Sequence, residues 1–346
     1  MKVIIAPQAF KGTLSVFEVG HAIEKGVQSA LPGAKTRFIP ISDGGDGFMD
    51  VLLHQHPGIR IQQTVTGPVG DQIEAEWGIF EDSRTAVFEL AQFAGLAMIS
   101  PEYRDPLTAT TRGLGEGLRS ALDKGIRDFV IGIGGSCTND AGTGIVEAFG
   151  GRFLDANGHS LPGGGASLEK LETIDLERLD PRIAVSKLVV ACDVKNPMTG
   201  QEGASLVYSP QKGACPSEAK QLERALQRFV EVVHRQYGID LNAIKGSGAA
   251  GGTAGGLHAL LNAELTSGID LVLEHMAFDE HLNNADLVVT GEGKMDAQTI
   301  YGKGPIVIAQ RAKARGIPVW AFVGSLGEGY EAVYDYGITK VIPLSF

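Results

Sequence analysis

The sequence is poor in cysteine and in basic residues. It has 346 residues with 3 cysteines, and its 30 Lys and Arg are outnumbered by 41 Asp and Glu, which gives a formal net charge of -11. Cys137, Cys192 and Cys215 are far apart and lack CxxC spacing, so neither a disulfide framework nor a cysteine zinc site is expected. The acidic balance argues against sequence-independent nucleic-acid binding, because that binding needs Lys and Arg to replace phosphate counterions.

Long apolar runs are also missing. None approaches the roughly 18 residues that a membrane-spanning helix needs, and residues 1–6 are too short for a signal peptide. Hydrophobic residues make up 43% of the chain and charged residues 21%, which is typical of a globular protein with a core. We therefore expect a soluble, cytoplasmic protein of two domains, at roughly 100–200 residues each.

Two chemical motifs are absent, and a third occurs without its usual context. The chain has no GxxxxGK[ST], which argues against a P-loop kinase, and no GxSxG, which leaves an α/β-hydrolase unsupported. A literal GxGxxG occupies residues 246–251, with Asp270 about 20 residues further on, but no strand is expected before it. An NAD-dependent oxidoreductase is therefore a minor alternative, and a helix from Thr253 is expected instead.

Glycine, in contrast, is abundant. Its 47 residues cluster where apolar runs end, at residues 44–45, 132–135, 246–256 and 291–293. Glycine allows the backbone to approach a ligand closely, so these junctions suggest bound phosphate or nucleotide. About a third of them are expected to be ordinary turns.

The apolar pattern predicts an α/β fold with a split domain. Short runs rich in β-branched residues predict five parallel strands near the two termini, at residues 2–6, 37–41, 286–289, 319–323 and 339–342. Neither terminal segment alone has enough strands to bury a sheet, so we expect residues 1–67 and 284–346 to form one Rossmann- or flavodoxin-like domain. Residues 68–283, with antiparallel strands near their start, would be an inserted mixed α/β domain.

Loops at the expected carboxyl ends of strands combine glycine with charged residues. Ligands of doubly wound sheets bind there. The charged residues are Lys11, Lys294, Asp43, Asp46, Asp140, Asp193, Glu292 and Asp296. Amides and lysines hold phosphates, carboxylates hold Mg²⁺, and one carboxylate takes the proton of an acceptor hydroxyl, so the set suits phosphoryl transfer. Each loop alone also fits turn chemistry, and Asp193 fits a helix N-cap equally well.

These loops resemble the motifs of the class I glycerate kinase family, which phosphorylates glycerate with ATP. The matching segments follow the family order: IIAPQAFKGTLS at 4–15, SDGGDG at 42–47, VTGPVG at 65–70, IGIGGSCTNDAGTG at 131–144, ACDVKNPMTG at 191–200, SPQKGA at 209–214, GAAGGTAGGL at 248–257 and TGEGKMDAQTIYGKGP at 290–305. The resemblance implies an ATP- and Mg²⁺-dependent kinase of two unequal α/β domains with the active site in the cleft between them. The usual product of the family is 2-phosphoglycerate.

The resemblance also implies roles for residues inside the matching motifs. Asp193 is the first candidate for the general base and Asp296 the second, with Lys11 and Lys294 as catalytic cations. The candidates for binding the hydroxy acid are Gln8, Lys11, Lys212, Gly291 and Glu292. The candidates for binding nucleotide phosphates are Gly134, Gly135, Ser136, Thr138, Asn139, Gly251 and Gly252. Mg²⁺ or its waters would be held by Asp43, Asp46 and Glu292.

The sequence departs from the family pattern in its first motif and at its end. Gln8 and Ala9 replace the usual Asp-Ser of APDSFKG, and Gln8 lacks the charge that a base or a strong metal ligand needs. Phe346 comes just after an expected strand, where family members usually continue into a closing helix, so a shortened chain is expected. Two alternatives remain: a kinase of a related sugar acid such as a tetronate, and a nucleotide-binding regulatory module without catalysis. The oligomeric state is not predicted.

Overall fold

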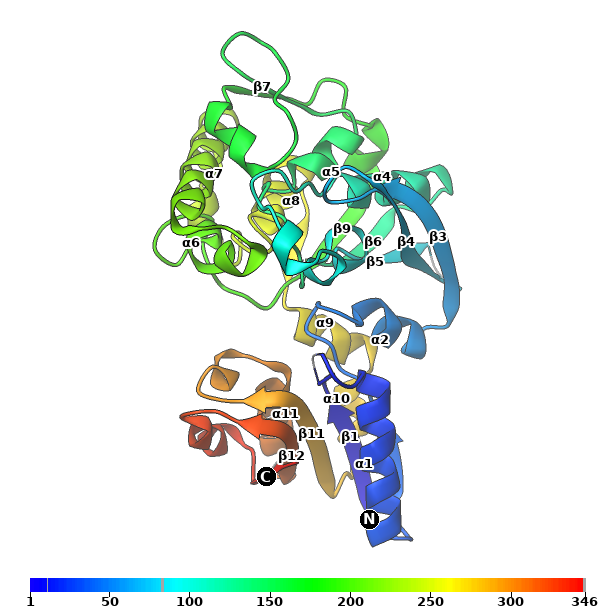
Figure 1. The fold of residues 1–346 in the computed structure, drawn as a ribbon. Coiled ribbons are helices and arrows are strands. Elements are labelled where there is room, and N and C mark those ends of the chain that lie inside the picture. The colour runs from blue at the N-terminus through cyan, green and yellow to red at the C-terminus, as the bar shows by residue number, and fades with distance from the viewer. Residues whose placement is uncertain (11, 82–83, 345–346) are drawn as a thin grey trace. The chain divides into compact units, whose positions relative to one another are not determined.

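The computed structural model describes residues 1–10, 12–81 and 84–344 (Figure 1). Lys11, for which a catalytic and a substrate role were expected, lies outside the described residues. Contacts divide the chain into unit 1, with residues 1–43, 50–55 and 267–346, and unit 2, with residues 44–49 and 56–266. Unit 1 contains a parallel sheet and unit 2 a mixed sheet, which confirms the expected α/β class.

These units end at other residues than the sequence suggested. Strand β3 (Gly58–Thr66) pairs along its whole length with β4 (Gln72–Phe80) in an antiparallel hairpin, so it belongs to unit 2 although residues up to 67 were expected in the split domain. At the other boundary, Arg311 forms ion pairs with Asp270 and Asp279. Those pairs place residues 267–283 with unit 1.

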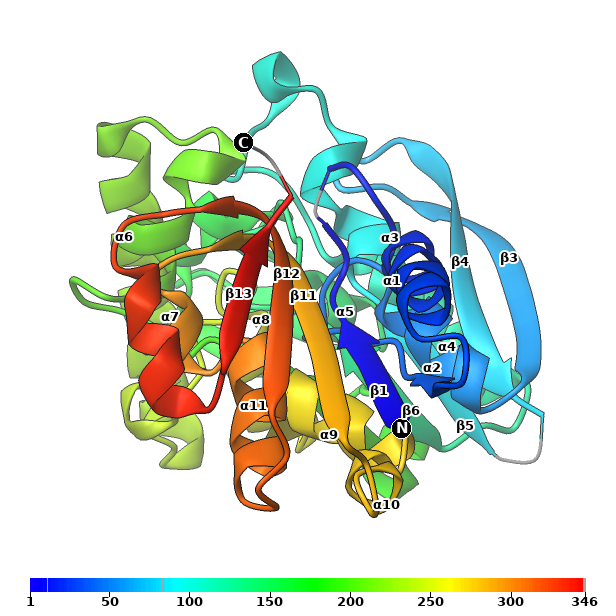
Figure 2. The ribbon, with the colours of Figure 1, turned by 90° about the horizontal axis from the view of Figure 1, so that it is seen from below.

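The sheet of unit 1 has five parallel strands in the order β13-β12-β11-β1-β2. Figure 2 shows β13, β12, β11 and β1 side by side. Their bounds are β1 Lys2–Pro7, β2 Lys35–Phe38, β11 Leu287–Met295, β12 Val319–Leu326 and β13 Lys340–Pro343. From β1 and β11 the chain continues outward in opposite directions, as in flavodoxin-like folds. Ligands of such sheets bind at this switch point, beyond the carboxyl ends of the two strands.

Helices of unit 1 are α1 (Val16–Ala30), α9 (Gly268–His275), α10 (Phe278–His281) and α11 (Gly304–Lys313), while α2 (Phe48–Gln55) contains residues of both units. Helix α1 begins at a capping box, in which Ser15 Oγ accepts from Glu18 N and the Glu18 carboxylate accepts from Ser15 N. This local signal was readable from the sequence. Ile23 and Val27 of α1 pack on the buried core of β1 and β11.

The segment GEGKM after residue 290 was expected to be a loop, and this expectation is wrong. Strand β11 continues to Met295 and β12 to Leu326, with Gly291 opposite Phe322 and Lys294 opposite Ser325. A Cβ atom on Gly291 would lie 2.4 Å from Phe322 O. Glycine is therefore required at position 291 by the close approach of the neighbouring strand.

Unit 2 contains a six-stranded sheet in the order β10-β9-β6-β5-β4-β3. Its remaining strands are β5 (Thr85–Glu89), β6 (Asp128–Gly132), β9 (Lys187–Ala191) and β10 (Glu264–Thr266), which run parallel to one another, while β4 and β3 are antiparallel. A separate hairpin pairs β7 (Arg152–Leu154) with β8 (Thr173–Asp175). Trp77 and Phe88 are buried and stacked at 5.0 Å in the core.

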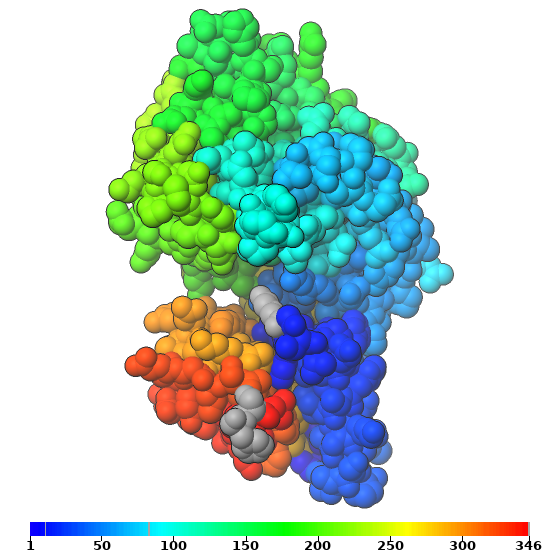
Figure 3. Space-filling model, viewed as in Figure 1, coloured from blue at the N-terminus to red at the C-terminus, as the bar shows by residue number. Residues whose placement is uncertain are grey.

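The α-helices of unit 2 are α3 (Ala91–Ala94), α4 (Arg112–Asp123), α5 (Thr143–Ala148), α6 (Ala204–Tyr208), α7 (Pro216–Tyr237) and α8 (Thr253–Leu261). Short 3₁₀ helices lie at Leu96–Met98, Pro101–Tyr103, Gly165–Lys170, Pro181–Val185, Pro210–Lys212 and Leu241–Ala243, and in unit 1 at Thr299–Tyr301 and Tyr330–Tyr336. The segment around residue 100, cyan in Figure 3, lies on the surface, where Arg104 Nη1 donates to Gln211 O. Within the described residues, no helix has both the length and the apolar character needed to span a membrane.

Candidate functional site

Residues 133–142, here called the glycine loop, follow β6 at the carboxyl edge of the unit 2 sheet. A Cβ atom on Gly134 would lie 2.5 Å from Gly45 Cα, and Gly134 N donates to Gly44 O at 2.9 Å. Gly135 has a φ of +72°, which favours glycine. Ser136, Thr138 and Asn139 are buried. The glycine loop is thus folded tightly against residues 44–45 of the same unit.

Asp140 is the main internal anchor of the glycine loop. Its buried carboxylate accepts hydrogen bonds from Thr111 N and Thr111 Oγ1, both at 2.8 Å, from Gly142 N at 3.1 Å and from Gly144 N at 3.4 Å. Burial raises the pKa of Asp140, while these hydrogen bonds act in the opposite direction. Asp140 therefore joins the starts of α4 and α5 and fixes the two left-handed residues that follow it, Ala141 and Gly142.

Lys212 lies inside unit 2, against the glycine loop. Its Nζ donates to Thr138 O at 2.6 Å and to Ser136 Oγ at 3.2 Å, and the side chain is buried. Burial lowers the pKa of Lys212 to about 8. The sequence suggested that Lys212 binds the substrate; in the structure its ammonium lies inside unit 2 against Thr138 and Ser136 of the glycine loop.

Three oxygens near this lysine are buried and have no hydrogen-bond partner among the described residues. They are Thr138 Oγ1, Asn139 Oδ1 and Ser209 Oγ. Asn139 Nδ2 does have a partner, since it donates to Ser205 Oγ at 3.1 Å. Buried polar atoms are normally paired, so unpaired ones at a glycine-rich loop suggest a place where a further polar group binds. This observation keeps Thr138 and Asn139 among the binding candidates.

Glu89, which the sequence reasoning missed, holds the SDGGDG segment. Its buried carboxylate, at the last residue of β5, accepts from Gly47 N at 2.8 Å and from Met49 N at 3.0 Å. Asp46, on the same segment, has its Oδ1 atom 2.7 Å from where a Cβ on Gly135 would lie. The Asp46 carboxylate is therefore next to the glycine loop. The sequence signal for Glu89 was a single carboxylate at the end of a strongly apolar strand.

Asp193 and the start of α8 lie at the same edge of the unit 2 sheet. Strands β6 and β9 are parallel neighbours, with Gly132 opposite Ala191. Asp193 comes two residues after the end of β9, just as the glycine loop comes after the end of β6.

The segment before α8 contacts the glycine loop. A Cβ on Gly251 would lie 2.2 Å from Thr138 O, and Ala141 N donates to Gly251 O. Gly251 and Gly252 thus hold the start of α8, the helix that was expected from Thr253, against the glycine loop.

In unit 1, charged side chains gather at the switch point. Glu292 is buried and accepts from Thr299 Oγ1 at 2.9 Å. Lys303 Nζ lies 3.7 Å from Glu292 Oε2 and 3.8 Å from Asp296 Oδ1, and Lys294 Nζ lies 3.6 Å from Asp296 Oδ2. Burial raises the pKa of Glu292, and the Lys303 cation opposes that effect. The cluster thus contains two carboxylates and two lysines.

Gln8 lies at this switch point as well. Its backbone N–H donates to Gly291 O at 2.9 Å, and a Cβ on Gly304 would lie 2.7 Å from the side-chain atom Gln8 Cδ. Gly304 is the first residue of α11, and Lys303 precedes it. The sequence reasoning missed Lys303 and Thr299, although both lie in the matching motif, and Lys303 stands directly before the Gly-Pro that opens a helix.

The expected Mg²⁺ ligands were Asp43, Asp46 and Glu292. Within the described ranges, no group of three His, Cys, Asp or Glu residues could hold a metal ion without further ligands. Mg²⁺ is commonly bound by one or two carboxylates together with phosphate oxygens and waters. Of the three expected ligands, Asp46 is the one whose carboxylate lies beside the glycine loop within unit 2.

Comparison with known proteins gives a consistent result. The sequence profile described as the Glycerate kinase family matches residues 3–345. Similar curated proteins include the glycerate kinases of Halalkalibacterium halodurans, 44% identical over 342 residues, and of Bacillus subtilis, 45% identical over 344 residues. The glycerate 2-kinase of Escherichia coli is 42% identical over 341 residues. Each alignment covers 99% of this chain and 90% of the relative.

A solved structure is similar across the same length. It is a crystal structure of a Salmonella typhimurium LT2 protein that is provisionally named glycerate kinase 2. The TM-score is 0.86 at 42% sequence identity, and the match covers 99% of this chain and 90% of that chain. The architecture of this chain is therefore one already seen in a crystal.

Proposed function

Because the chain belongs to the glycerate kinase family, we propose that it transfers a phosphoryl group from ATP to the 2-hydroxyl of D-glycerate and yields 2-phosphoglycerate. The structural observation that carries the proposal is the glycine loop, whose shape is held by Asp140, Lys212 and residues 44–45. A rigid loop of this kind suits phosphoryl transfer, since catalysis there consists mainly of positioning and electrostatic stabilisation.

The nucleotide phosphates would bind to the glycine loop. We assign this role to the amides of Gly134, Gly135 and Ser136, together with Thr138 and Asn139. Gly251 and Gly252 support the loop from the start of α8, whose N-terminal amides add partial positive charge. Lys212 would act from inside by keeping Thr138 in place, and its one remaining N–H could also reach an anion.

Mg²⁺ would be held by Asp46 and the phosphate oxygens, with Asp43 and Glu292 as further candidates. When bound, the ion neutralises charge that develops on the transferred phosphoryl group. Glu89 keeps Asp46 in place through its hydrogen bonds to Gly47 N and Met49 N. Glu292 is the weaker candidate, because its carboxylate already accepts from Thr299 and faces Lys303.

For the general base, Asp193 is preferred over Asp296. Asp296 lies between Lys294 and Lys303, where it suits holding these two cations in position. Asp193 lies at the strand edge that also carries the glycine loop. Its role would be to take the proton from the 2-hydroxyl as the new P–O bond forms.

The substrate carboxylate would be bound by the cations of unit 1. Lys294 and Lys303 are candidates because both are partly exposed, and Gln8 can donate a hydrogen bond beside them. Lys11 stays a candidate from the sequence. Gly291 would contribute only through its backbone, since glycine has no side chain, and its carbonyl oxygen already accepts from Gln8 N.

The test is incubation with ATP, Mg²⁺ and D-glycerate, with ADP release measured and the product identified by phosphorus NMR. Phosphate on the 2-hydroxyl is the expected result. Phosphate on the 3-hydroxyl would contradict the proposed position, and faster turnover of a four-carbon sugar acid would identify the related-substrate alternative. ATP binding without turnover of either acid would favour the regulatory module.

A further inference from the structure

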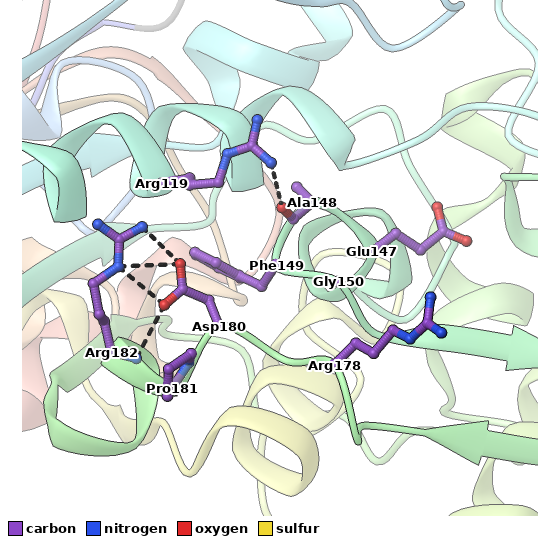
Figure 4. Close-up of a pocket in the computed structure, with 9 residues that line it drawn as sticks. All are labelled: Arg119, Glu147, Ala148, Phe149, Gly150, Arg178, Asp180, Pro181 and Arg182. Atoms are coloured by element: carbon purple, nitrogen blue, oxygen red, sulfur yellow. Dashed lines mark hydrogen bonds and ion pairs between the residues drawn. The ribbon is translucent and has the colours of Figure 1, made fainter.

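A hollow on unit 2 takes no part in the proposed kinase reaction. It has a volume of about 540 Å³ and is lined by Arg119, Glu147, Arg178, Asp180 and Arg182 around Phe149 and Gly150 (Figure 4). We call it the arginine hollow. Its volume lies within the roughly 300–1,000 Å³ that small-molecule sites occupy.

The arginine hollow lies at the opposite edge of the unit 2 sheet from the glycine loop. Helices α4 and α5 both begin beside Asp140 and end at the hollow, where Arg182 pairs with Asp123, the last residue of α4. Lys187 N donates to Arg127 O at the starts of β9 and β6. The hollow is therefore distinct from the glycine loop.

The walls of the hollow are fixed by their own contacts. Asp180 N donates to Phe149 O at 2.8 Å, and Arg119 Nη1 donates to Ala148 O at 3.1 Å. Gly150, with a φ of +98°, allows Arg178 O to approach within 2.3 Å of where its Cβ would lie. Arg119 thus covers the last carbonyl of α5, whose partial negative charge would otherwise repel an anion.

The charges in the hollow do not cancel. Arg182 is neutralised, because its guanidinium binds the Asp180 carboxylate through Nε and Nη2 and Asp123 through Nη1. Arg178 makes no hydrogen bond or ion pair with any described residue, although it interacts electrostatically with Asp175, whose carboxylate binds Arg152. Among the described residues, the Arg119 guanidinium bonds only to a carbonyl, Ala148 O. The remaining acid, Glu147, lies 3.7 Å from Arg112, and its burial raises its pKa to about 7.

Two guanidinium groups without carboxylate partners therefore face one hollow in a chain of net charge -11. Figure 4 shows Arg119 on one side of Phe149 and Gly150 and Arg178 on the other. Guanidinium groups bind carboxylates and phosphates through two parallel hydrogen bonds, which an ammonium cannot form. A monovalent anion could neutralise only one of them.

We propose that the arginine hollow is a second binding site, for a small multivalent anion such as a tricarboxylate or a phosphorylated acid, held by Arg119 and Arg178. The ligand spans the floor of Phe149 and Gly150 and places one acidic group against each guanidinium. Arg182 and Asp180 form a wall in which their opposite charges cancel, and Asp123, the second acid bound to Arg182, is exposed outside the lining of the hollow. The site is independent of the kinase reaction.

The test uses citrate as the probe, titrated calorimetrically into the full chain saturated with ADP and glycerate, with Mg²⁺ omitted. One citrate is expected per chain. In the double variant R119Q/R178Q the affinity is expected to fall by at least about tenfold, because two charge-assisted contacts are lost. The matched control R224Q/R235Q removes two guanidinium groups of α7 that form ion pairs elsewhere on unit 2, and it is expected to bind citrate like the parent.

Equal losses in the two double variants would overturn the proposal, since the binding would then reflect overall charge. So would the absence of binding to the parent at about 10 mM citrate. Circular dichroism checks that each variant is folded. If R119Q/R178Q does not fold, the variant R119K/R178K is measured instead. It keeps both positive charges but cannot form the two parallel hydrogen bonds of a guanidinium group. Several-fold weaker citrate binding would then support the site, and unchanged affinity would contradict it.

Discussion

The ammonium of Lys212 donates a hydrogen bond of 2.6 Å to the carbonyl oxygen of Thr138, and both residues are buried in unit 2. A buried cation is stable only where it is paired or hydrogen-bonded, and here its acceptors are Thr138 O and Ser136 Oγ of the glycine loop. The loop and the lysine therefore depend on each other. Loss of the proton from Lys212 should alter the loop that is proposed to bind phosphate.

This dependence predicts opposite pH effects on activity and stability. The pKa of Lys212 is lowered by burial from 10.5 to about 8, so from pH 8 to 10.5 the unfolded chain holds the extra proton. The contribution of Lys212 to the free energy of unfolding therefore rises as pH increases from 8 to 10.5. We expect kcat/KM for ATP to fall above pH 8 over the same range, as the ammonium loses its charge.

Activity profiles and urea unfolding of the parent and of K212M, each measured across this window, check the prediction. K212M should lack both pH dependences, and it should be poorly active at every pH. A parent enzyme whose kcat/KM for ATP is flat from pH 7.5 to 9.5 would contradict the role given to Lys212. The variant K212R separates charge from geometry, since it keeps the charge at every pH in the window.

A second prediction concerns Glu89. The Glu89 carboxylate accepts hydrogen bonds from the backbone N–H groups of Gly47 and Met49. In E89Q, the side-chain NH₂ would face one of these two N–H groups, so a donor would meet a donor. We expect a loss of about 1–3 kcal/mol in the free energy of unfolding, because buried hydrogen bonds to a charged group are broken. Since Asp46 is on the segment that Glu89 holds, KM for Mg²⁺-ATP should also rise.

Urea unfolding and steady-state kinetics measure the two effects of E89Q. The matched control is E76Q, which removes an exposed carboxylate paired with Arg60 on the same sheet. That control should change stability by less than about 0.5 kcal/mol. If E89Q loses stability but keeps the parent KM for Mg²⁺-ATP, Glu89 has a structural role only.

The assignment of the general base predicts different outcomes for two aspartates. D193N should lower kcat by about 10²–10⁴-fold, because a carboxamide cannot accept the proton. D296N should lower kcat much less, because the Asp296 carboxylate is given the role of holding Lys294 and Lys303 and not that of taking the proton. Pre-steady-state measurement of ADP formation tests this directly. A D193N enzyme with near-parental turnover would transfer the role to another group.

Lys303 is predicted to bind the substrate carboxylate. K303M should raise KM for glycerate about tenfold or more while leaving KM for ATP unchanged, because a charge-assisted contact to the hydroxy acid is lost. The control K313M lies at the end of α11, the helix that Lys303 precedes; Lys313 Nζ donates to Asp335 O, and this variant should behave like the parent. An increase in KM for ATP alone would show that Lys303 belongs to the nucleotide.

Much of the parallel sheet could be predicted from the sequence. Strands buried on both faces have continuous apolar stretches, so Val3, Ile5, Val289 and their neighbours gave an unambiguous pattern. The capping box at Ser15 was equally readable, because both of its hydrogen bonds join residues three positions apart. Signals of this kind are local and need no knowledge of the fold.

What the sequence did not reveal depends on partners far along the chain. The segment after Thr290 is rich in glycine and polar residues, yet it forms a strand because β12 pairs with it. Glu89 binds amides that lie 40 or more residues earlier, and the internal role of Lys212 depends on a carbonyl 74 residues away. In each case the residue type was compatible with several roles, and the tertiary contact decided among them.

A last prediction concerns Glu147, at the end of α5. Burial raises its pKa from 4.5 to about 7, with Arg112 acting in the opposite direction, so the folded protein holds more protons than the unfolded chain between these values. The free energy of unfolding should therefore fall as pH rises from 4.5 to 7. E147Q cannot ionise and should be more stable than the parent at pH 8, by about 1–3 kcal/mol.

Near pH 4 the same two proteins should be close in stability, because Glu147 is then protonated in both the folded and the unfolded state. Urea unfolding at several pH values measures the difference, and E231Q, an exposed residue of α7, serves as the control with no such trend. A difference between parent and E147Q that does not grow between pH 4.5 and 7 would mean that the Arg112 cation outweighs burial and that Glu147 is ionised throughout. In that case the carboxylate would also weaken the attraction of the arginine hollow for anions, so the two experiments inform each other.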